Sequence, residues 1–162
     1  MAICEAKNTE VKELLRNGVD VNAKGGYYGT ALQAACYCNA KAADLLLREK
    51  VDVNVQGGCY GTALQAASCV GDGILVEVLL EKGAVVNIQG GRYGNALMAA
   101  VSNGHKDVIY KLAKNGAKLP DDKEGLLLKT ALSEGCEAGI KMMFGLWKIP
   151  LLFGRDTPLT AE

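Results

Sequence analysis

The chain has 162 residues, of which 49% are apolar, and its 18 basic and 18 acidic residues give a formal net charge of zero. This length and apolar content are enough for the core of one domain. The balanced charge argues against nucleic acid or an anionic membrane as partner, because neither would find a basic surface. No apolar run approaches the roughly 18 residues of a membrane-spanning helix, and Glu5 interrupts the stretch where a secretory signal would be apolar.

Residues 1–22 predict one amphipathic helix and the turn that follows it. Val11, Leu14 and Leu15 recur at helical spacing, and Gly18 and Val21-Asn22 come after them. In the light of the repeats described next, this segment is typical of the second half of a repeat. The first half is then missing or cut to residues 2–7.

Residues 23–54 predict a glycine-rich chain reversal followed by two helices. Gly25-Gly26 and Tyr28-Gly29 favour the reversal, because glycine adopts positive φ at little cost. Thr30 stands where its hydroxyl can cap a short helix that begins at Ala31. A second helix follows, with Lys50 in the place of a capping glycine, which should cost about 1 kcal/mol.

The same pattern returns over residues 55–87 and 88–119. The segment Tyr28-Gly29-Thr30-Ala31-Leu32 reappears 32 residues later, and again 33 residues after that, as Tyr60-Gly61-Thr62-Ala63-Leu64 and Tyr93-Gly94-Asn95-Ala96-Leu97. A period in this range indicates a solenoid, in which each unit buries its apolar face against its neighbours. The sequence therefore predicts an all-α solenoid of helix-turn-helix units with short β-hairpin-like loops. We expect these loops to stack side by side.

Residues 120–148 predict a degenerate repeat, with an inner helix over 126–132 and an outer helix around 140–144. Residues 149–162 predict the start of a further partial repeat or a tail, because Thr157-Pro158-Leu159 is typical of a repeat opening. We expect one domain over 1–162. Solenoids need polar terminal caps, and neither end contains a well-formed one. This favours an excised segment of a longer array over a short natural protein with degenerate caps.

These motifs resemble the ankyrin repeat, most fully in the third copy, from Tyr93-Gly94-Asn95-Ala96-Leu97 through Gly104-His105 to Gly116-Ala117. The usual Thr-Pro-Leu-His of that family is Thr-Ala-Leu-Gln in two copies here and Asn-Ala-Leu-Met in the third. The Gly-Gly-x-Tyr-Gly-[Thr/Asn]-Ala-Leu variant resembles repeats found in large fungal NACHT-type and related innate-immunity-like proteins. The ankyrin resemblance implies a cytoplasmic protein-interaction module that binds through a concave groove.

Comparison of the copies with each other separates structural from candidate binding positions. Tyr28, Tyr60 and Tyr93 repeat identically, and we expect them to stack as a ladder; direct ligand contact is the alternative. Positions that vary while keeping their place are candidate partner contacts. Near the hairpin tip and at the exposed end of the inner helix these are Tyr27, Tyr37, Cys38, Cys59, Cys69, Val70, Arg92, Ser102 and Asn103. The resemblance implies that they lie along the groove. The alternative is that these positions vary because no selection acts on them.

The six cysteines predict free thiols in a reducing compartment. They are Cys4, Cys36, Cys38, Cys59, Cys69 and Cys136. No Cys-x-x-Cys pair is present, and Cys36-Tyr37-Cys38 lacks a second pair at metal-ligand spacing. We therefore expect neither metal nor disulfides.

An enzymatic function is disfavoured, and the sequence predicts no catalytic residue and no cofactor. The only histidine, His105, stands at the Gly-His position, where the resemblance implies a structural hydrogen bond at the helix start. Cysteine nucleophiles and carboxylate pairs remain formally open. The Gly-Gly pairs lack the preceding strand and following lysine of a phosphate-binding loop.

The sequence thus predicts a protein-interaction module, with an unknown protein as partner and with no nucleic acid or membrane bound. The alternative is a ligand- or peptide-sensing repeat segment of a fungal innate-immunity-like receptor.

Overall fold

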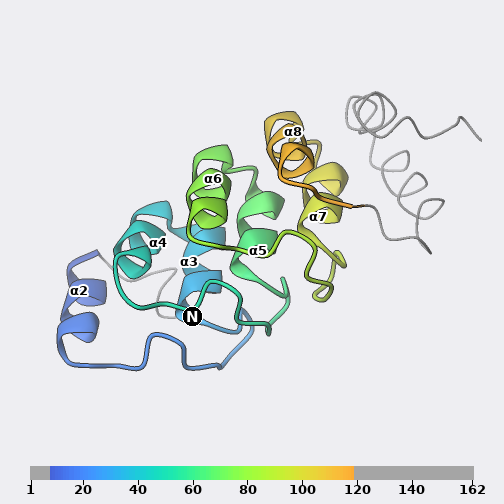
Figure 1. Cartoon of the computed structure of the whole chain (residues 1–162). Coiled ribbons are helices and arrows are strands. Elements are labelled where there is room, and N and C mark those ends of the chain that lie inside the picture. The colour runs from blue at the N-terminus through green and yellow to red at the C-terminus, as the bar shows by residue number, and fades with distance from the viewer. Residues whose placement is uncertain (1–7, 119–162) are drawn as a thin grey trace, which may run out of the picture.

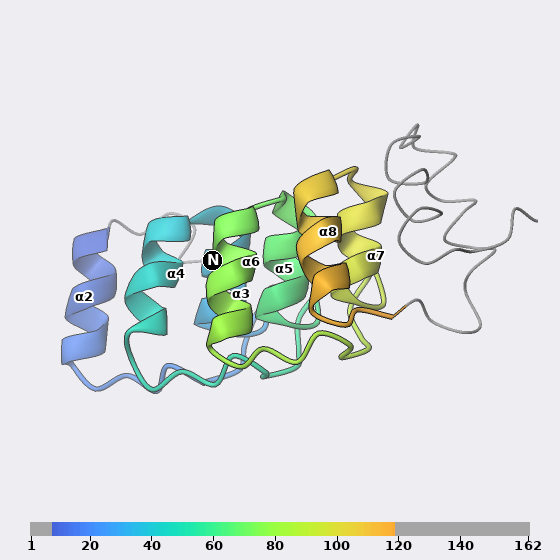
Figure 2. The same cartoon turned by 45° about the horizontal axis from the view of Figure 1, so that its top comes forward.

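The protein is an all-α stack in which the helices stand in two rows, as the sequence predicts. The structure, a computed structural model, describes residues 8–118, so the expectations for residues 2–7, 120–148 and 149–162 lie outside it. The described helices are α2 (Asn8–Arg16), α3 (Ala31–Cys38), α4 (Ala40–Leu47), α5 (Ala63–Val70), α6 (Gly73–Glu81), α7 (Ala96–Ser102) and α8 (Lys106–Lys114). Helices α3, α5 and α7 form the inner row, and α2, α4, α6 and α8 form the outer row (Figures 1 and 2).

Each inner helix begins where a side-chain oxygen caps its first turn. Thr30, Thr62 and Asn95 are extended residues whose side chains accept from the backbone N–H three positions later. In the first two copies that later residue is Gln33 or Gln65, whose Oε1 accepts in return from the threonine N–H at 2.7 and 3.0 Å. These reciprocal capping boxes confirm the expected starts of the inner helices.

The outer helices end differently in different copies. After α6, Gly83 adopts φ +87°, and the Ala84 N–H donates to the Leu79 carbonyl at 2.9 Å, which is a Schellman turn. After α4, Lys50 holds the glycine position, and the Val51 N–H donates to a carbonyl only two residues back. The Schellman pattern is absent there, as expected when lysine replaces the capping glycine.

The core lies between the two rows and is continuous along the stack. Leu32, Leu64 and Leu97 of the inner helices are each 1% exposed, and Leu79 of α6 is fully buried. Buried alanines such as Ala67 let adjacent inner helices approach closely. Apolar burial between neighbouring units is therefore the main source of stability, as in other solenoids.

The Gly-Gly-x-Tyr-Gly segments form tight hairpins that stack side by side. Among residues 8–118 no strand forms, and each hairpin is closed by a single antiparallel bridge: Gly25 with Gly29, Gly57 with Gly61, and Gly90 with Gly94. Successive hairpins are joined through their backbones: the Cys59 N–H donates to the Tyr27 carbonyl and the Arg92 N–H donates to the Cys59 carbonyl, each at 2.8 Å. The expectation of stacked hairpins is confirmed.

Two sets of polar side chains bridge neighbouring repeats. The Gln65 Nε2 donates to the Ile88 and Gly94 carbonyls at 3.0 and 3.2 Å, and Gln33 makes the equivalent pair of bonds one repeat earlier. At the exit turns, the Asn54 Nδ2 donates to the Gly83 carbonyl at 3.0 Å, and its Oδ1 accepts from the next repeat at 2.8 Å. These bonds explain why the asparagine of each Val-Asn pair repeats.

Candidate functional site

The repeated tyrosines form the predicted ladder. The rings of Tyr28 and Tyr60 stack with centroids 6.1 Å apart, and those of Tyr60 and Tyr93 stack with centroids 6.5 Å apart. Their planes are inclined by 14° and 18°. Tyr60, in the middle, is only 5% exposed. The ladder is thus a packed part of the stack.

Tyr37 also belongs to this ladder, which its variable position in the repeats did not indicate. Its ring stacks on Tyr60 at 4.6 Å and lies 5.5 Å from Tyr28, and the residue is half-buried. Burial, and then a hydrogen bond with Tyr37, raise the pKa of Tyr60 above its ordinary value. The expectation that Tyr37 is an exposed contact position is therefore wrong in part, because most of its surface is covered by packing.

Tyr27 and Arg92 lie at the hairpin tips, and both side chains are exposed to solvent. Tyr27 is 63% exposed, and its ring meets Tyr28 edge to face at 5.2 Å. A hydrogen bond with Cys59 raises the pKa of Tyr27. Arg92 is also exposed, and its guanidinium carbon lies 5.0 Å from the centroid of the Tyr93 ring, which is cation–π geometry. These two side chains combine exposure with support from a rigid neighbour.

Cys69 and Asn103 lie close together, next to the hydroxyl of Tyr93. The Cys69 thiol contacts the Tyr93 hydroxyl at 3.6 Å, and the Asn103 Nδ2 lies 3.7 Å from the same sulfur. His105 Nε2 lies 2.9 Å from the Cys69 carbonyl, while its side chain makes no capping bond at the start of α8. The histidine is structural, as expected, but it joins two repeats instead of capping its own helix.

Two more of the predicted contact positions differ from expectation. Ser102 is only 5% exposed, because the last turn of α7 packs it inward, so it is not available to a partner. Cys38 is exposed but disulfide-bonded, so the expectation of six free thiols is wrong at this position. Cys36, Cys59 and Cys69 are free thiols, and Cys4 and Cys136 lie outside the described residues. Val70 is 45% exposed, as expected for a surface position.

We call the hairpins 23–30, 55–62 and 88–95, together with α3, α5, α7 and the residue after each helix, the inner face. Its charged residues are Lys24 and Arg92, and it contains no carboxylate. The carboxylates of the described residues all lie on the outer helices or on the turns that flank them: Glu10, Glu13, Asp20, Asp44, Glu49, Asp52, Asp72, Glu77, Glu81 and Asp107. An electrically neutral chain therefore carries a weakly positive, aromatic inner face.

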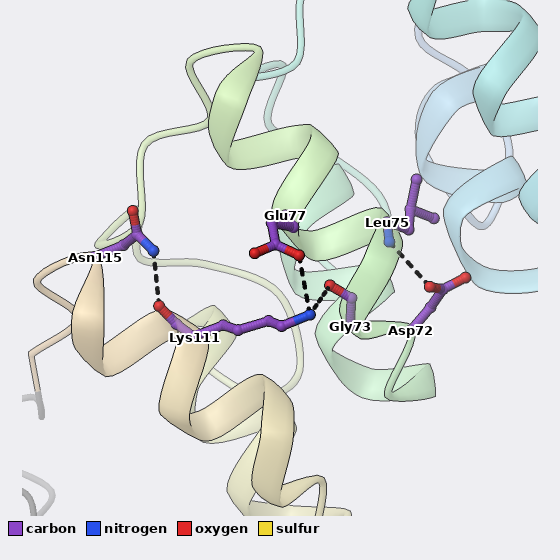
Figure 3. Close-up of polar contacts among 6 residues, drawn as sticks. All are labelled: Asp72, Gly73, Leu75, Glu77, Lys111 and Asn115. Carbon is purple, nitrogen blue, oxygen red and sulfur yellow. Dashed lines mark hydrogen bonds and ion pairs between the residues drawn. The ribbon is translucent and has the colours of Figure 1, made fainter.

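Hollows also lie on the outer face. A cleft of about 440 Å³ between α6 and α8 is lined by charged and aromatic side chains. At its edge, the Lys111 Nζ donates to the Gly73 carbonyl at 2.9 Å and to Glu77 at 3.1 Å (Figure 3). A second hollow, of about 230 Å³, lies beside α2 and is lined mainly by apolar residues such as Leu14 and Val19.

The bridging glutamines are the residues that sequence comparison missed. Gln33 and Gln65 are each 1% exposed, and each makes bonds to its own cap and to the next hairpin. A signal was present, because Thr-x-x-Gln at a helix start is the pattern of a capping box. The contact with the next repeat has no local signal.

The described residues contain no group of three or more His, Cys, Asp or Glu side chains placed to hold a metal ion. Within residues 8–118, no helix combines the length and apolar character needed to cross a membrane.

Comparison with known proteins agrees with the geometry of the stack. A family model described as ankyrin repeats (three copies) matches residues 1–90 and 47–123, which together make up most of the chain. A search among curated proteins gives no match.

Proposed function

The chain belongs to the ankyrin-repeat family, and from that premise we propose that it binds a protein partner through its inner face. Ankyrin repeats are generally protein-interaction modules, and the family resemblance implies that a partner occupies a concave groove on this side. The observation that carries the proposal is the arrangement of the variable side chains Tyr27, Arg92 and Asn103. All three are exposed, and all lie along the face where neighbouring repeats share backbone hydrogen bonds and stacked rings.

Rigid support favours binding here. The ring of Tyr27 is held by Tyr28, and the Arg92 guanidinium is held over Tyr93. A side chain that is ordered before binding loses less conformational entropy when a partner arrives. Tyrosine and arginine are also the residue types that dominate interface hot spots, where truncation costs at least ~2 kcal/mol.

The test is selection of peptides from a phage-displayed random library against the full chain, followed by affinity measurements with variants. We expect Tyr27→Ala and Arg92→Ala each to weaken the selected peptides more than tenfold. Tyr110→Ala is the matched control, because Tyr110 is a 52% exposed tyrosine on outer helix α8. Peptides that lose affinity only with Tyr110→Ala would move the binding surface to the outer face.

A second candidate function rests on the Gly-Gly-x-Tyr-Gly hairpins. Their resemblance to repeats of fungal NACHT-type proteins supports a cytoplasmic receptor segment that senses a ligand or peptide. The sequence that flanks these repeats in the parent gene distinguishes the two candidate functions. A nucleotide-binding NACHT-type domain upstream supports the receptor function, and the absence of such a domain excludes it.

A further inference from the structure

The charge of the inner face restricts the chemistry of its partner. The described chain has ten carboxylates, yet none lies on the inner face, whose two charged residues are the cations Lys24 and Arg92. An acidic segment approaching this face meets no like charge, whereas a basic segment finds no carboxylate to pair with. Such an arrangement gives specificity through both attraction and repulsion.

The ladder of tyrosines is incomplete in its second interval. Between Tyr28 and Tyr60, the ring of Tyr37 packs against both tyrosines. One repeat later the corresponding residue is Cys69, whose small thiol contacts the Tyr93 hydroxyl. The ladder spacing is nearly the same in the two intervals, 6.1 and 6.5 Å. The third ring that supports the first interval is therefore absent from the second.

The two features meet at Tyr93. Its ring lies beneath the guanidinium of Arg92, and its hydroxyl touches Cys69. When a carboxylate of a partner pairs with Arg92, the neighbouring residues of that partner lie close to the interval between Tyr60 and Tyr93. This is the interval that lacks a third ring.

We propose that the inner face binds a peptide segment of a protein in which a carboxylate lies close to an aromatic side chain. The carboxylate pairs with Arg92, and the aromatic ring packs beside Tyr93 and Cys69, in the place that Tyr37 fills one repeat earlier. This inference rests on the proposed function and deepens it by naming the class of partner.

The first experiment measures peptide binding to the full chain by fluorescence anisotropy. The probe is a fluorescein-labelled 12-residue peptide that contains two Asp-Tyr-Asp units separated by Gly-Ser. Three analogues replace the aspartates by asparagine, the aspartates by lysine, or the tyrosines by serine. We expect the asparagine and serine analogues to bind at least tenfold more weakly than the probe, and the lysine analogue not to bind.

The second experiment uses variants of the chain. Cys69→Tyr supplies the missing ring from the protein itself, so we expect at least a tenfold loss of probe binding with an unchanged or higher Tm. Ile74→Tyr is the matched control, because it adds the same ring at a 77% exposed position on α6 and should bind normally. Arg92→Gln should bring the aspartate and asparagine peptides to the same affinity, and Arg92→Lys should retain a preference for aspartate.

The outcomes separate this inference from the proposed function. Equal binding of the aspartate and asparagine peptides, or normal binding by Cys69→Tyr, would overturn the acidic-aromatic class. If library-selected peptides still require Tyr27 and Arg92 while the probe does not bind, the inner face remains the binding surface and only the class of partner is wrong. If the selected peptides need neither residue, the proposed function fails as well.

Discussion

The inner and outer sides of the stack are joined by different kinds of interaction. On the inner side, neighbouring repeats share backbone hydrogen bonds between hairpins, stacked tyrosine rings and the buried glutamines Gln33 and Gln65. On the outer side, within residues 8–118, the polar contacts between α6 and α8 come from one side chain, Lys111, which reaches Gly73 and Glu77 (Figure 3). Glu77 is 60% exposed, so that ion pair is open to solvent.

The difference shows where the repeats are held in register. Breaking a buried hydrogen bond leaves a polar group without a partner and costs about 1–3 kcal/mol, whereas an exposed ion pair contributes about 0–1 kcal/mol. The tyrosines, which are identical in the three copies, couple one copy to the next on the inner side. The outer surface can vary because less of the coupling depends on it.

The largest effect is expected where two hairpins touch. Gly58 has φ +62°, and a Cβ placed on it would overlap the Tyr28 carbonyl of the preceding hairpin. We expect Gly58→Ala to lower the free energy of unfolding by about 3 kcal/mol or more, because it adds this overlap to the strain of positive φ. Urea denaturation followed by circular dichroism measures the loss.

Gly26→Ala is the control for that loss. Gly26 has nearly the same conformation, φ +67°, but no described atom lies within 4 Å of its added Cβ. We expect it to cost only about 1–2 kcal/mol, from backbone strain alone. Equal losses for the two variants would show that contact between hairpins does not stabilise the stack.

The second prediction concerns the bridging glutamine. Gln65→Met copies the residue that the third repeat has at this position, Met98, and removes the bonds to the Ile88 and Gly94 carbonyls and to the Thr62 N–H. We expect a loss of about 2–3 kcal/mol, because these buried or partly buried groups are left without a partner. Thermal and urea unfolding measure it.

The same substitution at an exposed glutamine tests whether the loss comes from the bridge. Gln89 is exposed, and its side chain bonds only to the Asn87 carbonyl two residues away. Gln89→Met should change stability by no more than about 0.5 kcal/mol. A similar loss at both positions would mean that the bridge contributes nothing beyond helix or loop preference.

The sequence predicts the parts of the fold that are set by local chemistry. Thr62 caps a helix because its hydroxyl lies three residues from the amide that it serves, and the repeat makes that signal appear more than once. The stacking of Tyr37 on Tyr60 and the Gln65 bonds to the Ile88 and Gly94 carbonyls depend on atoms in another repeat. A single chain carries no local signal for those contacts.

The disulfide at Cys38 illustrates the same limit for the candidate site. Cysteine number and spacing indicate neither pairing nor burial, so a free thiol was the natural prediction. The variable positions Tyr27, Val70, Arg92 and Asn103 are exposed as predicted. Comparison of the copies therefore identified exposed positions correctly at these four residues. It was wrong at Ser102, which the last turn of α7 packs inward.

A third prediction uses pH to probe the tyrosine ladder. Burial and the bond with Tyr37 raise the pKa of Tyr60, so the folded state keeps a proton that the unfolded state releases above about pH 10. The free energy of unfolding should therefore fall above that pH, by up to about 1.4 kcal/mol per pH unit for this residue. Chemical denaturation between pH 9 and about 11 measures the slope.

Tyr60→Phe isolates the contribution of Tyr60 to that slope. The buried thiol of Cys36 also has a raised pKa, from burial, and it contributes a fall of the same sign in both proteins. We expect the variant to be less stable near neutral pH, because it lacks the bond with Tyr37, and to approach the wild type as the pH rises. Parallel profiles for the two proteins would show that the hydroxyl of Tyr60 is not protected in the fold.

The smallest effect is expected on the outer side, from Glu77→Gln. The change removes the charge that faces Lys111 at 3.1 Å but leaves the Lys111 bond to the Gly73 carbonyl in place. An exposed pair of this kind contributes less than about 1 kcal/mol and is screened by salt. We therefore expect a loss below about 0.5 kcal/mol at low ionic strength and none in about 1 M NaCl, measured by urea denaturation at both. A loss as large as that of Gln65→Met would mean that the outer helices set the register of the repeats as firmly as the inner face does.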